Sequence, residues 1–211
     1  MELLINTYMA EIVAVIAIAT LMAVIPGADF VMVTRTSIRN GRWAGLYTTF
    51  GICLSICIHA TYSIAGLAVV IANSVWLFSI IKYLGAAYLV YIAWQLLTTR
   101  ELLANDQHVE SESISDFAAL RLGFLSNILN PKAPIFFISI FTQVVSLETP
   151  LIMQISYGLI IVLAHLIWFG SVALLLSHPS LLPRFNKHKQ KIDKAAGIML
   201  ILFSVKLSLV S

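Results

Sequence analysis

The stretch Pro26-Gly27-Ala28-Asp29-Phe30 interrupts the first apolar run of this chain, and Asn130-Pro131-Lys132-Ala133-Pro134 interrupts the fourth. Proline removes a backbone donor and clashes with the preceding helical turn, while glycine admits unusual backbone angles. We therefore expect both apolar segments to break or kink at these positions. In a membrane, the freed backbone groups must find partners in the protein or in a water-filled cavity.

The composition around these two breaks is that of a membrane protein. The chain has 211 residues, of which 60% are hydrophobic and 11% are charged, and its mean hydropathy is +0.94. Soluble domains are roughly a quarter charged. Residues 1–211 are therefore predicted to form a single integral membrane domain. The net charge of +3 does not indicate a nucleic-acid partner, because that interpretation requires a basic patch on a water-exposed surface.

Six apolar stretches are long enough to cross a bilayer, which takes about 20 residues. They cover residues 8–33, 45–72, 76–97, 122–147, 151–176 and 192–210. Asn73-Ser74 supplies a turn between the second and the third, and Pro150 suits the start of the fifth. The N-terminus lacks the basic segment and cleavage site of a signal peptide, so the first stretch should be retained. The pattern predicts an all-α membrane protein with six transmembrane helices.

The basic residues predict the orientation, because cytoplasmic flanks of membrane spans carry an excess of Lys and Arg. Of the 13 basic residues, ten fall on one side of the six-span arrangement, namely Arg35, Arg39, Arg42, Arg100, Arg121, Arg184, Lys187, Lys189, Lys191 and Lys194. Only Lys82 and Lys206 lie near the other side, and Lys132 falls within a span. We expect both termini on the non-cytoplasmic side.

The two halves of the chain also contain a proline and a histidine at nearly the same spacing. Pro26 and His59 are 33 residues apart, and Pro131 and His165 are 34 residues apart. Three spans in each half would make the second half enter the membrane in the opposite direction. The sequence thus predicts two inverted three-helix repeats, as in many secondary transporters.

The predicted repeats are residues 1–99 and 121–211, and residues 100–120 connect them. This connection contains five acidic residues and several serines but no glycine or proline. It is predicted to be a solvated cytoplasmic linker.

The first break carries an acidic residue and the second a basic one. Asp29 is expected either to cap the half-helix that follows it or to serve as a proton or ammonium site, because a carboxylate at membrane depth is costly unless paired or wet. Lys132 lies eleven residues beyond Arg121, about 16 Å into its span. It needs a partner, which Asp29 or a substrate carboxylate could provide, with Asn127 and Asn130 adding hydrogen bonds. The candidate substrate-binding residues are Pro26, Gly27, Asp29, Asn127, Asn130, Pro131 and Lys132.

Two histidines occupy equivalent positions in the second and fifth spans. His59 and His165 could relay protons together with Asp29, or could simply form interhelical hydrogen bonds. Cys53 and Cys57 suggest a metal or redox pair, but no further soft ligand lies near them in sequence, and packing is the plainer role. The sequence contains no nucleotide-binding glycine loop and no nucleophile–base set, so we expect neither an enzyme nor a cofactor.

The order of motifs resembles the lysine-exporter superfamily, in particular its homoserine/threonine-efflux branch. The resemblance rests on Pro26-Gly27 with Asp29-Phe30, TRTSIRNGRWAG at 34–45, Gly51 with His59 and Gly66-Leu67, GAAYLVYIAWQLL at 85–97, NILNPKAPIFF at 127–137, and residues 193–197. Two departures stand out. Members commonly have proline where this chain has Ala28, and often an acidic residue near Ile56.

This resemblance implies a multi-pass protein of the bacterial inner (plasma) membrane that exports amino acids or related small metabolites in exchange for protons. Partners would be the amino-acid substrate, protons and lipid. A homo-oligomer is also possible, because the small residues Gly85, Ala86, Ala87 and Ala93 suit a close helix contact. Three alternatives remain: a thiol electron-transfer protein using Cys53 and Cys57, a metal-ion exporter of the same architecture, and a membrane scaffold.

Overall fold

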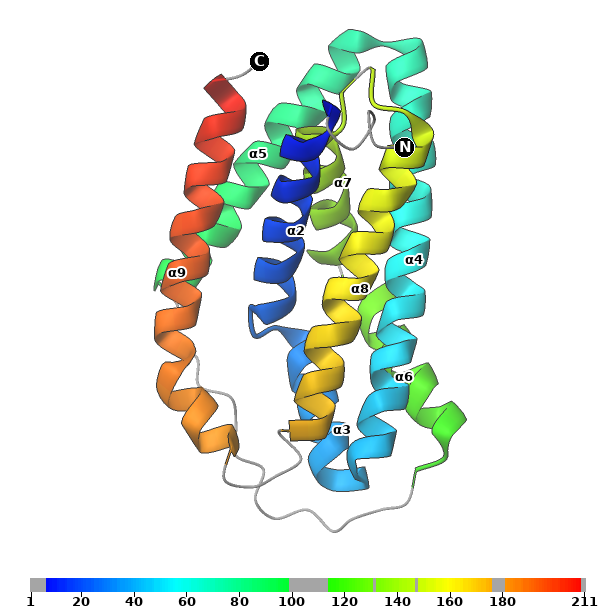
Figure 1. The fold of residues 1–211 in the computed structure, drawn as a ribbon, viewed down its shortest axis with the longest axis vertical. Coiled ribbons are helices and arrows are strands. Elements are labelled where there is room, and N and C mark those ends of the chain that lie inside the picture. The colour runs from blue at the N-terminus through cyan, green and yellow to red at the C-terminus, as the bar shows by residue number, and fades with distance from the viewer. Residues whose placement is uncertain (1–6, 99–113, 131, 147, 176–180, 210–211) are drawn as a thin grey trace.

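The computed structural model describes residues 7–98, 114–130, 132–146, 148–175 and 181–209. Within these ranges the chain forms eight α-helices and no strand, which confirms the predicted all-α class. The helices are α2 (Met9–Val24), α3 (Ala28–Asn40), α4 (Arg42–Asn73), α5 (Val75–Thr98), α6 (Asp116–Ile128), α7 (Lys132–Val144), α8 (Leu151–Leu175) and α9 (Leu181–Leu209). Most of them run along the long axis of the molecule (Figure 1).

Three of these helices are long and apolar enough to cross a bilayer by themselves, through segments Arg42–Leu67, Trp76–Gln95 and Leu151–Leu175. Two further spans arise if each bent pair counts as one. The pair α2 and α3 bends by 53°, and the pair α6 and α7 bends by 62°. The sixth predicted span lies within α9 and is not among these five, so the six-span count stays a prediction.

Both bends lie where the proline motifs predicted them. At the first, the Ile25 backbone N–H donates to the Leu21 carbonyl at 3.0 Å and closes α2, after which Ile25 and Gly27 are extended. At the second, the Asn130 Oδ1 accepts from the backbone N–H of Lys132 at 3.0 Å, so that Asn130 caps α7 as asparagine commonly does. Pro131 itself lies outside the described residues.

The two bent pairs run in opposite directions. In Figure 1, α2 and α3 descend from the end where the termini lie, whereas α6 and α7 ascend towards it. Each pair is followed by two long helices, α4 and α5 in one case and α8 and α9 in the other. Opposite directions are what an inverted repeat requires, although its symmetry stays a prediction.

Two helices begin earlier than the apolar stretches suggested. Helix α6 starts at Asp116, inside the predicted linker, because the Ser115 hydroxyl accepts from the backbone N–H of Ala118 at 3.2 Å and caps the first turn. Helix α9 starts at Leu181, eleven residues before the predicted span. The basic residues that precede this span are therefore helical, although they are not apolar. Residues 100–113, which make up most of the linker, lie outside the described residues.

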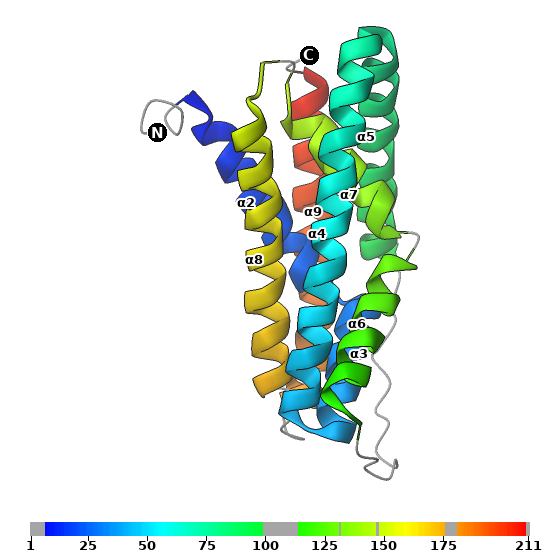
Figure 2. The same cartoon turned by 90° about the vertical axis from the view of Figure 1, so that its right-hand side faces the viewer.

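Glycines allow α4 and α6 to pack backbone against backbone (Figure 2). A Cβ atom at Gly51 would overlap the Leu120 carbonyl oxygen, and one at Gly123 would overlap the Thr48 carbonyl oxygen. The Thr48 hydroxyl also approaches the Ala119 carbonyl oxygen at 3.2 Å. At the lower end, Gly41 joins α3 to α4 with φ of 89°, a conformation that glycine adopts without strain.

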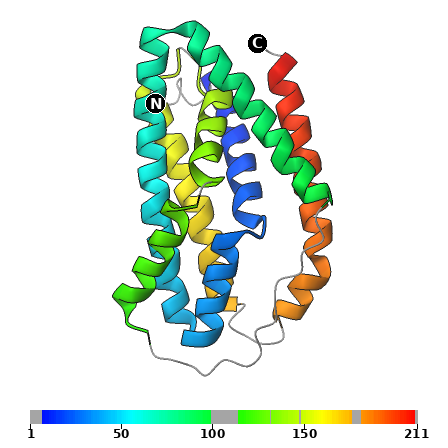
Figure 3. The same ribbon diagram turned by 180° about the vertical axis from the view of Figure 1, so that it is seen from behind.

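Helices α5 and α9 form one side of the bundle. They lie side by side both from the front and from behind (Figures 1 and 3), and a Cβ atom at Gly197 would come within 3.0 Å of the Ala93 carbonyl oxygen. On another face of α5, Gly85 packs against Ser139 of α7. Within the small-residue stripe predicted around Gly85, Gly85 itself therefore makes a contact inside the chain, whereas Ala87 is exposed.

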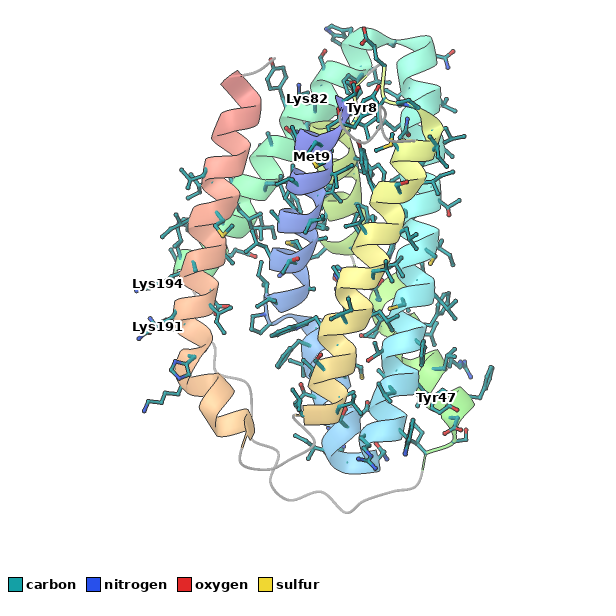
Figure 4. All side chains as sticks on the ribbon, in the orientation of Figure 1. Tyr8, Met9, Tyr47, Lys82, Lys191 and Lys194 are labelled. Carbon is teal, nitrogen blue, oxygen red and sulfur yellow. The ribbon has the colours of Figure 1, made fainter. Side chains whose placement is uncertain are left out.

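Many large apolar side chains are exposed on the surface of the bundle. Trp76, Ile167 and Leu159 are 74%, 69% and 56% exposed, as expected of helices that face lipid. In Figure 4, Lys82 lies at the upper end with Tyr8 and Met9, and Lys191 and Lys194 project outward lower on α9.

Candidate functional site

The two helix breaks enclose a cavity of about 390 Å³. Each of the eight described helices contributes to its wall. Representative lining residues are Met22 of α2, Asp29 of α3, Ile56 of α4, Tyr88 of α5, Asn127 of α6, Phe137 of α7, His165 of α8 and Asp193 of α9. A cavity at the junction of two discontinuous helices is where secondary transporters commonly place their substrate.

The first break contributes a carboxylate that is held from the second bent pair. The Asn127 Nδ2 donates to the Asp29 Oδ2 at 2.8 Å, which joins α6 to α3 across 98 residues of sequence. Asp29 does not cap its helix, because Gly27 occupies the N-cap position of α3. The capping hydrogen bond considered for Asp29 does not form; Asp29 lies in the first turn of α3 and lines the cavity.

Two oxygen atoms of the Asp29–Asn127 pair accept no hydrogen bond from the described residues. The Asp29 Oδ1 and the Asn127 Oδ1 are both buried, and neither has a hydrogen-bond partner in the part of the chain that the structure describes. A buried acceptor without a partner costs about 1–3 kcal/mol. Both atoms belong to residues that line the cavity.

Lys132 is the first residue of α7 and also lines the cavity. Its carbonyl oxygen accepts from the Tyr88 hydroxyl at 3.4 Å. Lys132 is exposed, and no contact within 4 Å joins its ammonium group to Asp29, although both side chains are among those described. Asp29 pairs with Asn127 instead, so the expected Asp29–Lys132 ion pair does not form in this conformation.

Three of the other predicted binding residues also lie at the cavity, and Pro131 is outside the described residues. Pro26, Gly27 and Asn130 line the cavity. At the start of α7 the backbone N–H groups of Lys132 and Ala133 donate to Asn130. The first residues of α3 and of α7 line the cavity, so the N-termini of two helices lie there. Such N-termini attract anions, including carboxylates.

The two histidines differ in their access to the cavity. His165 of α8 lines it, and its Nδ1 donates to the Ile161 carbonyl at 2.8 Å. His59 of α4 is 1% exposed and does not line the cavity, but its Nε2 lies 3.4 Å from the Asn127 carbonyl oxygen. His59 and His165 therefore differ in their surroundings, although they occupy equivalent positions in the two halves of the sequence.

Sequence reasoning left three polar residues out of the candidate site. Tyr88, Gln95 and Asp193 line the cavity from α5 and α9. Asp193 is only 5% exposed although it lies between the exposed Lys191 and Lys194. The only signals for these residues were the two family-like stretches, 85–97 and 193–197, that contain them.

The cysteines are both free, with Cys53 buried and Cys57 exposed. Among the described residues, no group of three or more His, Cys, Asp or Glu side chains is placed to hold a metal ion.

Comparison with known proteins places the chain in a family. A family described as LysE type translocator matches residues 20–211. The chain is 32% identical to the membrane protein YrhP of Bacillus subtilis over 209 residues, which cover 95% of this chain and all of YrhP. It is 30% identical to the threonine efflux protein of Salmonella typhimurium, over 92% of this chain and 95% of that protein. It is 27% identical to the threonine efflux protein of Escherichia coli K12 over the same shares.

No solved structure matches the chain. The family match covers nearly all of the sequence, including both helix breaks and every residue that lines the cavity. The chain therefore belongs to the LysE type translocator family, a family of membrane transporters.

Proposed function

We propose that this protein exports amino acids, threonine or homoserine or related small metabolites, from the cytoplasm in exchange for protons. It would lie in the bacterial inner membrane with both termini outside, and the cavity would open alternately to the two sides. The observation that carries the proposal is the pair of unsatisfied acceptors on Asp29 and Asn127, in the same cavity as Lys132. Relatives named threonine efflux proteins support the substrate class.

A zwitterion needs both signs of charge in its site. The substrate ammonium group would donate to the Asp29 Oδ1 and the Asn127 Oδ1, which then gain the donors that they lack. The substrate carboxylate would bind next to Lys132 at the N-terminus of α7, where the ammonium group and the helix dipole favour an anion. Asn130, with Pro131, Pro26 and Gly27, would set the geometry of the two breaks.

Proton exchange would follow from the same carboxylate. When the ammonium group leaves to the outside, Asp29 loses a cationic partner in an enclosed site, and a buried carboxylate without a partner is costly. A proton from the outside would take its place and would be released to the cytoplasm when the next substrate binds. His165, which also lines the cavity, is the proposed route for that proton.

The proposal is tested by counterflow of L-threonine and other amino acids into proteoliposomes, with and without an imposed pH gradient. Wild-type protein should exchange at least one amino acid, and the pH gradient should drive its accumulation. Asp29→Asn and Lys132→Met should each reduce exchange at least tenfold, whereas Glu148→Gln, at an exposed position away from the cavity, should not. Unchanged exchange in both cavity variants would refute the proposed site.

A further inference from the structure

His59 contacts both sides of the second helix break from its position in α4. Its Nε2 lies 3.4 Å from the carbonyl oxygen of Asn127, near the end of α6. Its ring stacks on Phe137 of α7, with centroids 5.5 Å apart and an interplanar angle of 28°. Because α6 and α7 meet at 62°, a side chain that contacts both of them restrains the angle of the break.

The contacts of His59 favour one of the two neutral forms of its imidazole ring. A backbone carbonyl can only accept, so the contact with the Asn127 oxygen places the hydrogen on Nε2, where the Ser55 hydroxyl oxygen also lies within 3.3 Å. The Nδ1 is then an acceptor, and the Tyr62 hydroxyl donates to it at 2.6 Å. Every polar atom of this neutral imidazole is satisfied by the protein.

Asn127 connects the hydrogen bonds of His59 to the cavity. Asn127 is joined to His59 by its backbone carbonyl and to Asp29 by its side-chain amide, whose Nδ2 lies 2.8 Å from the Asp29 Oδ2. A rotation of the last turn of α6 would move the Asn127 amide relative to the Asp29 carboxylate, which lies on α3. His59 itself is 1% exposed and outside the cavity wall, so it does not contact a substrate there.

We propose that His59 is a positioning residue that fixes Asn127, so that its Oδ1 and the Asp29 Oδ1 point together at the substrate ammonium group. The inference rests on the proposed function and narrows it, because it assigns His59 to holding the ammonium subsite and not to carrying the proton. Tyr62 supports it by keeping the hydrogen of the imidazole on Nε2.

The test compares variants that keep or remove the donor at the Nε2 position. His59→Gln can place an amide N–H close to where the imidazole N–H lies, while His59→Phe keeps the ring that stacks on Phe137 but has no donor. We measure KM and maximal rate for L-threonine counterflow in proteoliposomes. His59→Phe should raise KM roughly five- to tenfold, as expected for the loss of one hydrogen bond, with the maximal rate within about twofold of wild type.

His59→Gln should restore a KM within about twofold of wild type and should still accumulate threonine in response to a pH gradient. Tyr62→Phe should raise KM less than His59→Phe does, and should add nothing to it in the double variant, since both act through the same bond.

Three results would overturn the inference. An unchanged KM in His59→Phe would show that the donor is not needed. Loss of pH-driven accumulation in His59→Gln, with exchange retained, would make His59 a proton carrier. If His59→Phe fails to fold, an unchanged KM in Tyr62→Phe would count against it. Absence of exchange in the wild-type protein is a separate outcome, which would refute the proposed function itself.

Discussion

Glu11, in the first turn of α2, connects residues that are far apart in the sequence. Its Oε2 accepts from the Tyr157 hydroxyl at 2.7 Å and from the Thr149 hydroxyl at 3.3 Å. A carboxylate near a helix N-terminus is favoured by the helix dipole, and Tyr157 is 1% exposed. This cluster therefore fixes the upper end of α2 against α8 and the turn before it.

Tyr157→Phe removes only the hydroxyl that donates to Glu11. A hydrogen bond to a charged acceptor contributes about 1.5–3 kcal/mol, so we expect the free energy of unfolding in detergent to fall by roughly that amount. Tyr83→Phe is the matched control, because Tyr83 is 58% exposed, and it should change little. Equal stabilities of the two variants would show that the Glu11 bond contributes nothing to the fold.

At the level of single residues, the sequence predicted those that carry a local signal. Asp29 and Lys132 were identified because a charge beside a helix break is unusual in an apolar segment. That Asp29 and Lys132 line the same cavity follows from the tertiary structure and could not be predicted from the sequence alone. Asp193 was not predicted as a site residue, because an acidic residue among lysines is typical of a solvated helix face, and only the packing of α9 on α5 turns it inward.

Among the elements, the contact of α4 with α6 leads to a prediction about two glycines. Gly123→Ala would place a methyl group on the Thr48 carbonyl oxygen, and overpacking of this kind costs about 1–3 kcal/mol. Gly66→Ala makes the same chemical change in α4, where a Cβ atom meets nothing within 4 Å. Alanine favours a helix over glycine by about 0.5–1 kcal/mol.

We therefore expect opposite shifts of the thermal unfolding midpoint in detergent, downward for Gly123→Ala and unchanged or upward for Gly66→Ala. Because α6 carries Asn127, Gly123→Ala should also weaken threonine exchange. If the two variants shift the midpoint alike, the close approach of α4 and α6 is wrong.

Helix boundaries were predicted where sequence chemistry marks them. The breaks in the two bent pairs and the turn at Ser74, between α4 and α5, coincide with Pro, Gly or Asn-Ser signals. The starts of α6 and α9 were not predicted, because a search for apolar residues finds spans and not helices. Asp116 and Leu181 begin helices that extend beyond their apolar parts.

For the whole molecule, the charge pattern and the course of the helices agree in one respect. Helix α2 begins and α9 ends at the same end of the bundle (Figure 1), as an even number of spans requires. The side of the membrane on which that end lies is a property of the protein in its bilayer, and it rests on the excess of basic residues at the connections of the opposite end.

This orientation can be tested by labelling single cysteines in intact cells with a membrane-impermeant maleimide. The background is Cys53→Ser with Cys57→Ser, which should retain threonine exchange, since neither thiol lines the cavity; loss of exchange would instead favour the thiol-based alternative. In that background, Glu148→Cys at the turn before α8 should be labelled from outside. Lys191→Cys, at an exposed position of α9, should be labelled only after the cells are opened.

The reverse pattern would invert the predicted orientation of the protein in the membrane, but not the direction of the proposed exchange. The site would keep its chemistry, because the groups around Asp29 and Lys132 do not depend on orientation. Exchange of a substrate for protons at one alternately exposed site follows the gradients across the membrane and not the orientation of the carrier, so proton-driven export would persist. The labelling experiment therefore tests the topology of the protein separately from the energetics of the proposed transport.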